Sequence, residues 1–293
     1  MPEAVVPGRA DAGSADTGSA DAGSGDAGAA DCSGERDSVL AERFGPALFG
    51  SAFPVAQKYA ELLIGAGVER GVVGPAEAAR IWDRHLLNCA AVARLVPIKS
   101  AVVDLGSGAG LPGIILAMLL PAARITLLEP MARRVEFLEE CVAELDLGNA
   151  AVVRGRAEEY AGQIAADVVT ARAVAPLEKL AGLCIGLLRP GGKVLAMKGS
   201  SAEAELARAR PVLARLGVGD ARVVLAGGAG GGPAATVVTF SAPVHRGSGY
   251  DSGRAGAARA EARPAGRPGG SPGYRGGSAA ARRARPNSRR GGS

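Results

Sequence analysis

The chain has 293 residues and a formal net charge of +5, and its two ends differ in composition from its middle. Residues 1–37 carry a net charge of −6 and residues 244–293 a net charge of +9, which leaves +2 for the part between them. The apolar runs are too short to span a bilayer, and the start of the chain lacks the basic and apolar segments of a secretion signal. We therefore expect a soluble, cytoplasmic protein with one folded region between two tails.

Both ends lack the large apolar side chains of a folded core. Within residues 1–37 an aspartate recurs every five residues from Asp11 to Asp31 in an Ala, Gly and Ser repeat, and residues 244–293 are rich in Arg and Gly. Neither composition buries enough apolar surface to offset the ordering entropy, so both tails are predicted to be disordered. The arginine-rich tail suggests contact with a polyanion, although a solvated tail without a specific partner fits its composition equally well.

Residues 38–98 have helical periodicity without a strand signal. Apolar side chains recur at helical spacing from Val39 to Phe49 and from Ala56 to Leu63. A third helix is predicted over Ile81–Leu95, and His85 shares one face of it with apolar residues. This region is therefore interpreted as an N-terminal helical cap packed on or beside a sheet.

From Ala101 onward strands alternate with helices, a pattern typical of βαβ units and a parallel sheet. The link between the last two strands is too short for a crossover helix, so we expect these strands to form an antiparallel pair at the sheet edge. The predicted fold class is α/β, a Rossmann-like sheet of seven mostly parallel strands over residues 99–243. The strands are expected at Ala101–Leu105, Arg124–Glu129, Ala151–Val153, Asp167–Thr170, Lys193–Met197, Arg222–Leu225 and Thr236–Phe240, and the helices at Ile114–Leu120, Met131–Leu145, Leu177–Leu188 and Ala202–Leu216.

A glycine-rich turn follows the first of these strands. Gly106, Gly108 and Gly110 allow positive φ angles and leave no Cβ between the backbone and a ligand. A strand, such a turn and the start of a helix together form a nucleotide-type cradle at the carboxyl end of a parallel strand. The turn also matches the dinucleotide fingerprint, so a nicotinamide cofactor and an oxidoreductase activity stay open on this evidence alone.

Two carboxylates favour a ligand that has a ribose but no phosphate. Asp104 lies directly before the glycines, where it would repel a pyrophosphate but suit a cationic group. Glu129 ends the second strand, where its carboxylate can accept hydrogen bonds from both hydroxyls of a ribose. With the reversed seventh strand, these features point to S-adenosylmethionine, which has a ribose and a positively charged amino acid end.

Several stretches in order resemble one enzyme family over roughly residues 40–241. Residues Asp104–Ile114 resemble the first motif of the small-subunit rRNA guanine-N7 methyltransferase G family, also called glucose-inhibited division protein B. The other matching stretches are Trp82–Asn88, which is similar to the helical-cap signature, Leu128–Leu138, which is similar to the second motif, and then Arg156–Glu158, Thr170–Ala173 and Met197–Gly199.

The resemblance implies a Rossmann-like class I methyltransferase that converts S-adenosyl-L-methionine to S-adenosyl-L-homocysteine. It implies N7 of a guanine in the 530 loop of 16S rRNA as the target, with 16S rRNA or the small ribosomal subunit as partner, no membrane and no metal, and we favour a monomer. The predicted cofactor-binding residues are the family contacts Gly106, Leu111, Ala157, Glu158 and Arg172, together with Asp104, Gly108, Gly110 and Glu129 from the reasoning above.

Guanine N7 has an in-plane lone pair and no hydrogen, so in-line methyl transfer to it needs no general base and depends on positioning and electrostatics. Thr170–Pro176 correspondingly lacks the Asn/Asp-Pro-Pro-aromatic run of exocyclic-amine methyltransferases, and no cysteine has the context of a carbon-5 nucleophile. A non-catalytic RNA-binding assembly protein is the remaining alternative. We predict that Arg172, Lys198 and His85 position the reactants. The residues predicted to bind RNA are Arg84, Arg133, Arg134 and Lys198. For each of these residues, a purely structural role in the core or a solvated position on the surface is the alternative.

Overall fold

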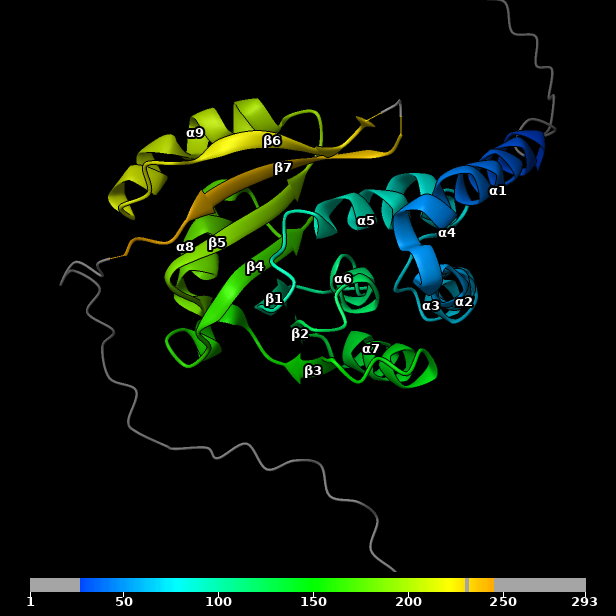
Figure 1. The fold of residues 1–293 in the computed structure, drawn as a ribbon, viewed down its shortest axis with the longest axis horizontal. Coiled ribbons are helices and arrows are strands. Elements are labelled where there is room, and N and C mark those ends of the chain that lie inside the picture. The colour runs from blue at the N-terminus through cyan, green and yellow to red at the C-terminus, as the bar shows by residue number, and fades with distance from the viewer. Residues whose placement is uncertain (1–26, 230–231, 245–293) are drawn as a thin grey trace, which may run out of the picture. The chain divides into compact units, whose positions relative to one another are not determined.

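A computed structural model of the chain describes residues 27–229 and 232–244. Seven strands form a single sheet in the order β3-β2-β1-β4-β5-β7-β6, with helices on both faces (Figure 1). The strands are β1 (Ala101–Leu105), β2 (Arg124–Glu129), β3 (Ala150–Arg154), β4 (Ala166–Arg172), β5 (Leu188–Lys198), β6 (Arg222–Gly227) and β7 (Ala234–Ser241).

The strand directions confirm the predicted fold class. β1 pairs in parallel with β2 and β4, β2 with β3, and β4 with β5. β7 runs antiparallel to β5 on one side and to β6 on the other, so the reversed strand lies inside the sheet and β6 forms its edge. Because the parallel strands all end at the same edge, the loops that follow β1 to β5 are gathered there.

Helices cover the sheet in two layers, each with its own apolar core (Figure 1). One face packs against helices α5 to α7 and the cap, and the other against α8 and α9. The predicted helices are present to within one residue at most ends, because their apolar periodicity is regular. The helices are α5 (Leu87–Ala93), α6 (Gly113–Leu119), α7 (Ala132–Glu144), α8 (Leu177–Leu187) and α9 (Ala202–Arg215).

The N-terminal region is helical, as expected, but it begins earlier and is more broken than its periodicity indicates. The third predicted helix is divided into two elements: a π-helical turn, which contains His85, and the α-helix α5. The elements before α5 are α1 (Ala27–Phe49), the 3₁₀ turn η1 (Gly50–Ala52), α2 (Phe53–Ile64), α3 (Ala66–Glu69), α4 (Pro75–Ala78) and the π-helical turn η2 (Trp82–Leu86).

The boundary expected between residues 37 and 38 lies inside α1, so residues 27–37 are helical rather than part of a disordered tail. Asp37 is buried, and its carboxylate accepts hydrogen bonds from the backbone N–H groups of Trp82 (2.9 Å) and Asp83 (2.7 Å). These long-range hydrogen bonds cannot be inferred from the composition of residues 27–37. The rest of the predicted acidic tail, residues 1–26, and the arginine-rich tail beyond residue 244 lie outside the described residues.

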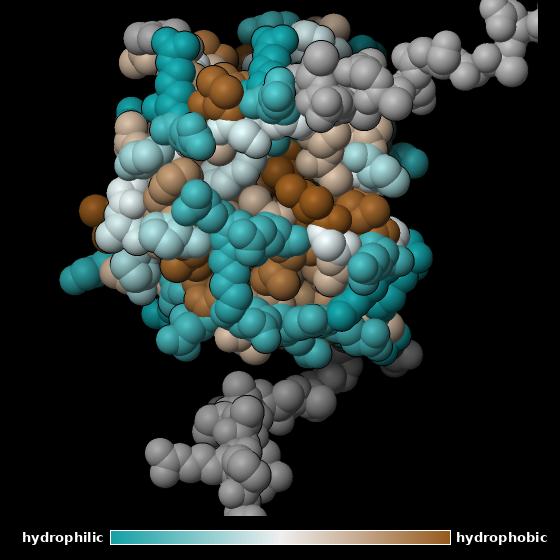
Figure 2. Space-filling view, turned by 90° about the vertical axis from the view of Figure 1, so that its right-hand side faces the viewer, coloured by the Kyte–Doolittle hydropathy of each residue, from teal (hydrophilic) through white to brown (hydrophobic). Residues whose placement is uncertain are grey.

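The face that carries the cap helices is a mixed surface, on which hydrophobic residues interrupt hydrophilic ones (Figure 2). Val39 and Ile64 are the large apolar side chains of α1 and α2 that are exposed. Over the ranges that the structure describes, no helix combines the length and the apolar character needed to cross a membrane.

Candidate functional site

The glycine-rich turn after β1 adopts the conformation that its residues predict. Gly106, Gly108 and Gly110 have φ angles of +67°, +61° and +96°, in the left-handed region that favours glycine. The N–H groups of Gly106 and Ser107 donate to the Leu128 carbonyl oxygen at 2.8 and 3.1 Å, which ties the turn to the end of β2. The turn is therefore held by hydrogen bonds between the carboxyl ends of two neighbouring strands.

Asp104 is fully buried and accepts hydrogen bonds from three groups of the protein. Its Oδ2 accepts hydrogen bonds from Ser107 Oγ (2.7 Å) and from the N–H of Gly113 (3.0 Å), and its Oδ1 accepts one from Thr170 Oγ1 (3.1 Å). Burial raises the pKa of this carboxyl to about 6, with the three hydrogen bonds opposing the rise. Asp104 thus connects β1, the turn, the start of α6 and β4.

Glu129 lies at the carboxyl end of β2 and is also buried. Its Oε2 accepts a hydrogen bond from the N–H of Gly108 (2.9 Å), and its Oε1 accepts one from the N–H of Met131 (3.0 Å). Arg134 Nη1 lies 3.9 Å from Oε1. The structure therefore brings the acidic residue and the middle glycine of the turn together, although they are 21 positions apart in the sequence.

The remaining predicted cofactor residues lie in loops at the same edge of the sheet. Leu111 is buried in the turn, and Ala157 is the buried first residue of the 3₁₀ turn η3 (Ala157–Tyr160) that follows β3. Glu158, the next residue, is exposed. Since the end of β3 pairs with the end of β2, this loop lies next to Glu129.

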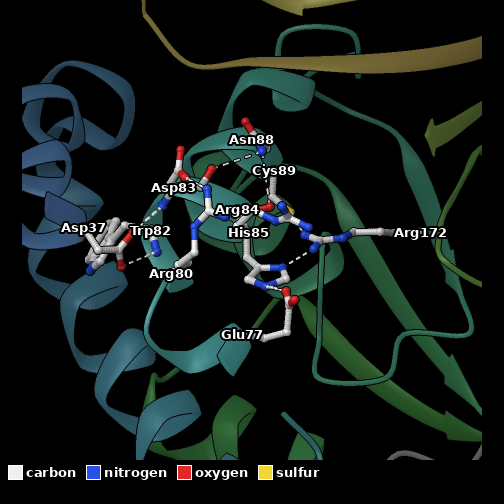
Figure 3. A network of polar contacts seen from close by, with 10 residues as sticks. All are labelled: Asp37, Glu77, Arg80, Trp82, Asp83, Arg84, His85, Asn88, Cys89 and Arg172. Carbon is white, nitrogen blue, oxygen red and sulfur yellow. Dashed lines mark hydrogen bonds and ion pairs between the residues drawn. The ribbon is translucent and has the colours of Figure 1, made fainter. Parts of the chain in front are cut away.

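Arg172, the last residue of β4, contacts the cap. One of its N–H groups meets Nδ1 of His85, and Nη1 lies 3.6 Å from Cys89 Sγ (Figure 3). On the opposite side of the imidazole, Nε2 lies 2.7 Å from Oε2 of Glu77. Burial, and then the positive charge of Arg172, lower the pKa of His85 to about 4, so the imidazole is neutral near pH 7. The structure thus places two of the three predicted positioning residues, His85 and Arg172, in direct contact.

The third of these residues, Lys198, is placed differently from the prediction. Its Nζ donates hydrogen bonds to Glu205 Oε1 (2.7 Å) and to the Ala175 carbonyl oxygen (2.9 Å), and both charged side chains are 11% exposed. The same carboxylate oxygen accepts the N–H of Leu177 at the start of α8 (2.7 Å). In this arrangement Lys198 holds the β4–α8 loop, and its ammonium is occupied by protein groups.

We therefore expect Lys198→Met to lower the free energy of unfolding by about 2 kcal/mol, the value of a hydrogen bond to a charged group. Glu205 should then retain an unpaired charge, so the double variant Lys198→Met/Glu205→Gln should recover part of the loss in urea unfolding. Unchanged stability together with weaker RNA binding would instead place Lys198 on the substrate, as the sequence predicted.

The same pair predicts a pH dependence. Burial would raise the pKa of Glu205, but the hydrogen bonds from Lys198 and Leu177 outweigh it and leave the pKa below its ordinary value of 4.5. The stabilisation is complete above that ordinary value and is lost as the pH falls through the lower pKa of the folded state.

The predicted RNA-binding arginines lie at two places around this edge. Arg84 is exposed on η2, Arg133 is exposed on the first turn of α7, and Arg134 is partly exposed beside Glu129.

Trp82 packs its ring against Phe49 and Phe53, with ring centroids 6.1 and 5.7 Å apart, and belongs to the core. In the part of the chain that the structure describes, no group of three or more His, Cys, Asp or Glu is arranged to hold a metal ion.

Tyr59 is a site residue that the sequence did not reveal. It is buried in α2, and its hydroxyl donates a hydrogen bond to the carbonyl oxygen of Ala109 in the glycine turn (2.6 Å). A Cβ added to Gly110 would lie 2.8 Å from this hydroxyl oxygen. The helical periodicity of α2 predicts only that Tyr59 is buried, and no local signal connects it with a turn 50 residues later. The cap therefore supports the turn directly.

Replacing Tyr59 by phenylalanine should lower the free energy of unfolding by about 1–3 kcal/mol, because a buried carbonyl loses its donor. It should also weaken binding of a ligand to the turn, which calorimetry measures. Tyr160→Phe is the matched control for stability, since the Tyr160 hydroxyl donates to the Arg154 carbonyl oxygen at an exposed position. An equal decrease in the free energy of unfolding for Tyr59→Phe and Tyr160→Phe would contradict a supporting role of Tyr59.

Comparison with known proteins gives matches over most of the described region. Residues 53–229 match the family model described as rRNA small subunit methyltransferase G. The ribosomal RNA small subunit methyltransferase G of Thermobifida fusca is 57% identical over 191 residues, which cover 65% of this chain and 81% of that protein. The protein of the same name from Salinispora tropica is 52% identical over 201 residues, which cover 66% and 83% of the two chains.

Among solved structures, Aeropyrum pernix fibrillarin in complex with natively bound S-adenosyl-L-methionine matches over 53% of this chain and 75% of that chain. The TM-score is 0.41 at 19% sequence identity, so the family relationship depends on the sequence matches and not on this structural likeness.

Proposed function

The chain belongs to the rRNA small subunit methyltransferase G family, and from this premise we propose that it transfers a methyl group from S-adenosylmethionine to N7 of a guanine in the 530 loop of 16S rRNA. One observation supports a ring nitrogen without a hydrogen as the methyl acceptor. Asp104 and His85, the buried titratable groups next to the turn and to Arg172, have their acceptor atoms engaged by groups of the protein. A target that requires proton removal would need a free base, whereas guanine N7 needs none.

The turn and its neighbours fit S-adenosylmethionine. Glu129 is held at the end of β2 against Gly108, where its carboxylate can accept hydrogen bonds from the ribose hydroxyls. The left-handed glycines keep side chains out of the turn, and the loop of Ala157 and Glu158 borders Glu129. We assign cofactor binding to these residues, with Leu111 in the turn and Arg172 at the end of β4. Asp104 was expected from the sequence to face the methionine end, but it is fully buried and hydrogen-bonded within the protein, so it supports the turn from behind.

The same contacts argue against a dinucleotide. A pyrophosphate binds on free N–H groups of a glycine turn and at the start of the following helix. Here the N–H of Gly108 donates to the Glu129 carboxylate, and the N–H of Gly113 at the start of α6 donates to the Asp104 carboxylate. Two carboxylates thus take the positions that a pyrophosphate requires. The oxidoreductase alternative fails on this ground and on the family relationship, which makes the chain a methyltransferase.

In the proposed mechanism, the protein positions two reactants and supplies electrostatic stabilisation. The bound cofactor supplies a methyl group activated by its positively charged sulfur. Arg172 holds its guanidinium at the carboxyl end of β4, next to the turn, where its N–H groups can orient the acceptor guanine. The exposed Arg84 and Arg133 and the partly exposed Arg134 contact the RNA phosphates, so the nucleobase approaches from this edge. In our assignment the cap begins with α1 and extends to residue 98, and residues 99–243 form the methyltransferase domain.

A methylation assay tests this proposal. Small ribosomal subunits from a strain that lacks the enzyme are incubated with the chain and a methyl-labelled donor, and the label is located by digestion of the RNA. Label at N7 of one guanine in the 530 loop is the expected result. Label at another position would refute the assignment of the target, and a lack of label with tight RNA binding would favour the non-catalytic alternative.

A further inference from the structure

Three side chains from three elements form a continuous contact between the cap and the carboxyl edge of the sheet (Figure 3). Glu77 comes from α4, His85 from η2 and Arg172 from the end of β4. The imidazole lies between the other two, with Nε2 2.7 Å from the Glu77 carboxylate and Nδ1 in contact with the Arg172 guanidinium. We refer to these residues as the Glu77–His85–Arg172 relay.

The chemistry of Arg172 determines where the imidazole carries its proton. A guanidinium can only donate hydrogen bonds, so Nδ1 must accept from Arg172 and must carry no proton. A neutral imidazole then carries its proton on Nε2, which lies 2.7 Å from the exposed Glu77 carboxylate. Arg172 therefore sets the neutral tautomer, and the position of Glu77 is compatible with it.

The charges around His85 keep this tautomer stable over the physiological range. Arg172 from β4 and Arg84 from η2 face the ring as positive groups, Glu77 from α4 as a negative group, and the buried Cys89 of α5 contacts the same guanidinium. The pKa of His85 is lowered to about 4 and burial raises the pKa of Cys89 to about 11, so neither changes its charge between pH 5 and 8.

The relay ends beside the glycine turn. Leu105 of β1 pairs with Ala171 of β4, so the residues that follow them, Gly106 and Arg172, are neighbours at the sheet edge. A Cβ added to Gly106 would lie 2.8 Å from Val174, two residues after Arg172. A shift of the Arg172 guanidinium would therefore change the geometry next to the glycine turn, where the reactants are proposed to meet.

From this geometry we propose that Glu77 and His85 are positioning residues: Glu77 holds the orientation of the imidazole through its contact with Nε2, and the imidazole fixes the guanidinium of Arg172 for methyl transfer. The inference rests on the proposed function. Glu77 lies outside all the stretches that pointed to the site from the sequence, and its role follows from the contacts alone.

Nuclear magnetic resonance tests the relay without reference to activity. The chain contains two histidines, His85 and His245, so a ¹⁵N-histidine-labelled sample gives two imidazole spectra, and His85→Asn identifies the signals of His85. We expect His85 to show an unprotonated Nδ1 and a protonated Nε2, without titration between pH 8 and 5. In Glu77→Ala the tautomer should stay the same, because Arg172 still requires an unprotonated Nδ1, but the Nε2 signal should shift because the nearby carboxylate is lost. A protonated Nδ1, a titration near pH 6.5, or an unchanged Nε2 signal in Glu77→Ala would overturn the proposal.

Kinetics test whether the relay acts on methyl transfer. Glu77→Ala should lower kcat by about 10- to 100-fold, the cost of a small displacement of a reacting group, with little change in KM for the RNA. Glu77→Gln should retain most of the rate, because its amide oxygen can still accept the Nε2 proton. Glu61→Ala, which removes an exposed glutamate from α2, is the matched control and should be unchanged.

The outcomes separate the relay from the proposed function. Full activity of Glu77→Ala, or equal losses in Glu77→Ala and Glu77→Gln, would overturn the positioning role. A wild-type chain that methylates no RNA would refute the proposed function, and would remove the positioning role with it, whereas the tautomer measurement would still decide whether the relay exists.

Discussion

Replacing Gly106 by valine is expected to abolish binding of S-adenosylhomocysteine while the chain remains folded. The φ angle of Gly106 is +67°, which a β-branched residue does not tolerate, and an added Cβ would lie 2.8 Å from a side-chain carbon of Val174. The turn would have to move away from Leu128, to which the N–H of Gly106 donates. Isothermal titration calorimetry with S-adenosylhomocysteine measures the loss, and circular dichroism checks the fold.

Gly148→Val is the matched control for this variant. Gly148 lies before β3 at the opposite edge of the sheet, its φ is not in the left-handed region, and an added Cβ would meet no atom within 4 Å. It should bind the ligand like the wild type. Unchanged affinity in Gly106→Val would show that the turn after β1 is not the cofactor site.

Substituting Arg172 by methionine should lower kcat for methylation by about 10²- to 10³-fold, the range seen when a donor that stabilises developing charge is removed. Arg172→Lys should not rescue the rate, since a single ammonium cannot contact His85 and the substrate with the geometry of a guanidinium. Single-turnover assays with saturating RNA measure the effect.

The control for Arg172 is Arg215→Met, which removes an exposed arginine at the end of α9. Its rate should equal that of the wild type. In Arg172→Met the pKa of His85 should also rise, because the positive charge of Arg172 is one of the causes of its lowered value. An Arg172→Met variant with full activity would remove this residue from the mechanism.

Much of this fold could be predicted from the sequence because its signals are local. The strands of the sheet are short apolar runs, and the reversal of β7 follows from the short link between it and β6. The glycine turn was predictable for the same reason, since three glycines directly after a buried strand indicate left-handed backbone. The burial of Asp37 was not predictable, because it depends on long-range hydrogen bonds with the backbone of Trp82 and Asp83.

The candidate site could be predicted only in part. Arg172 and His85 were indicated by motifs that lie 87 positions apart, and the structure brings them into contact. Lys198 was expected on the substrate, and its pairing with Glu205 could not be foreseen because it depends on how α9 packs against the sheet. Tyr59 acts through one long-range contact, and Glu77 acts through one contact with His85 of a different helical element; neither residue lies in a sequence motif.

The two carboxylates at the turn acquire a more specific role from the structure. In the sequence, Asp104 argued against a phosphate because of its negative charge, and Glu129 argued for a ribose because it ends the second strand. In the folded protein they also take the N–H groups of Gly113 and Gly108, which a pyrophosphate would need. Electrostatics and hydrogen-bond geometry thus favour the same class of ligand.

Mapping of N7-methylguanine in 16S rRNA tests the central proposal most directly. RNA is prepared from a strain that lacks the gene and from the same strain complemented with the wild-type chain or with Arg172→Met, and cleavage at N7-methylguanine is read along the whole molecule. Our account predicts one modified guanine in the 530 loop with the wild-type chain, less modification of the same guanine with Arg172→Met, and none with the empty strain. An unmodified 530 loop in the presence of the wild-type chain would contradict it.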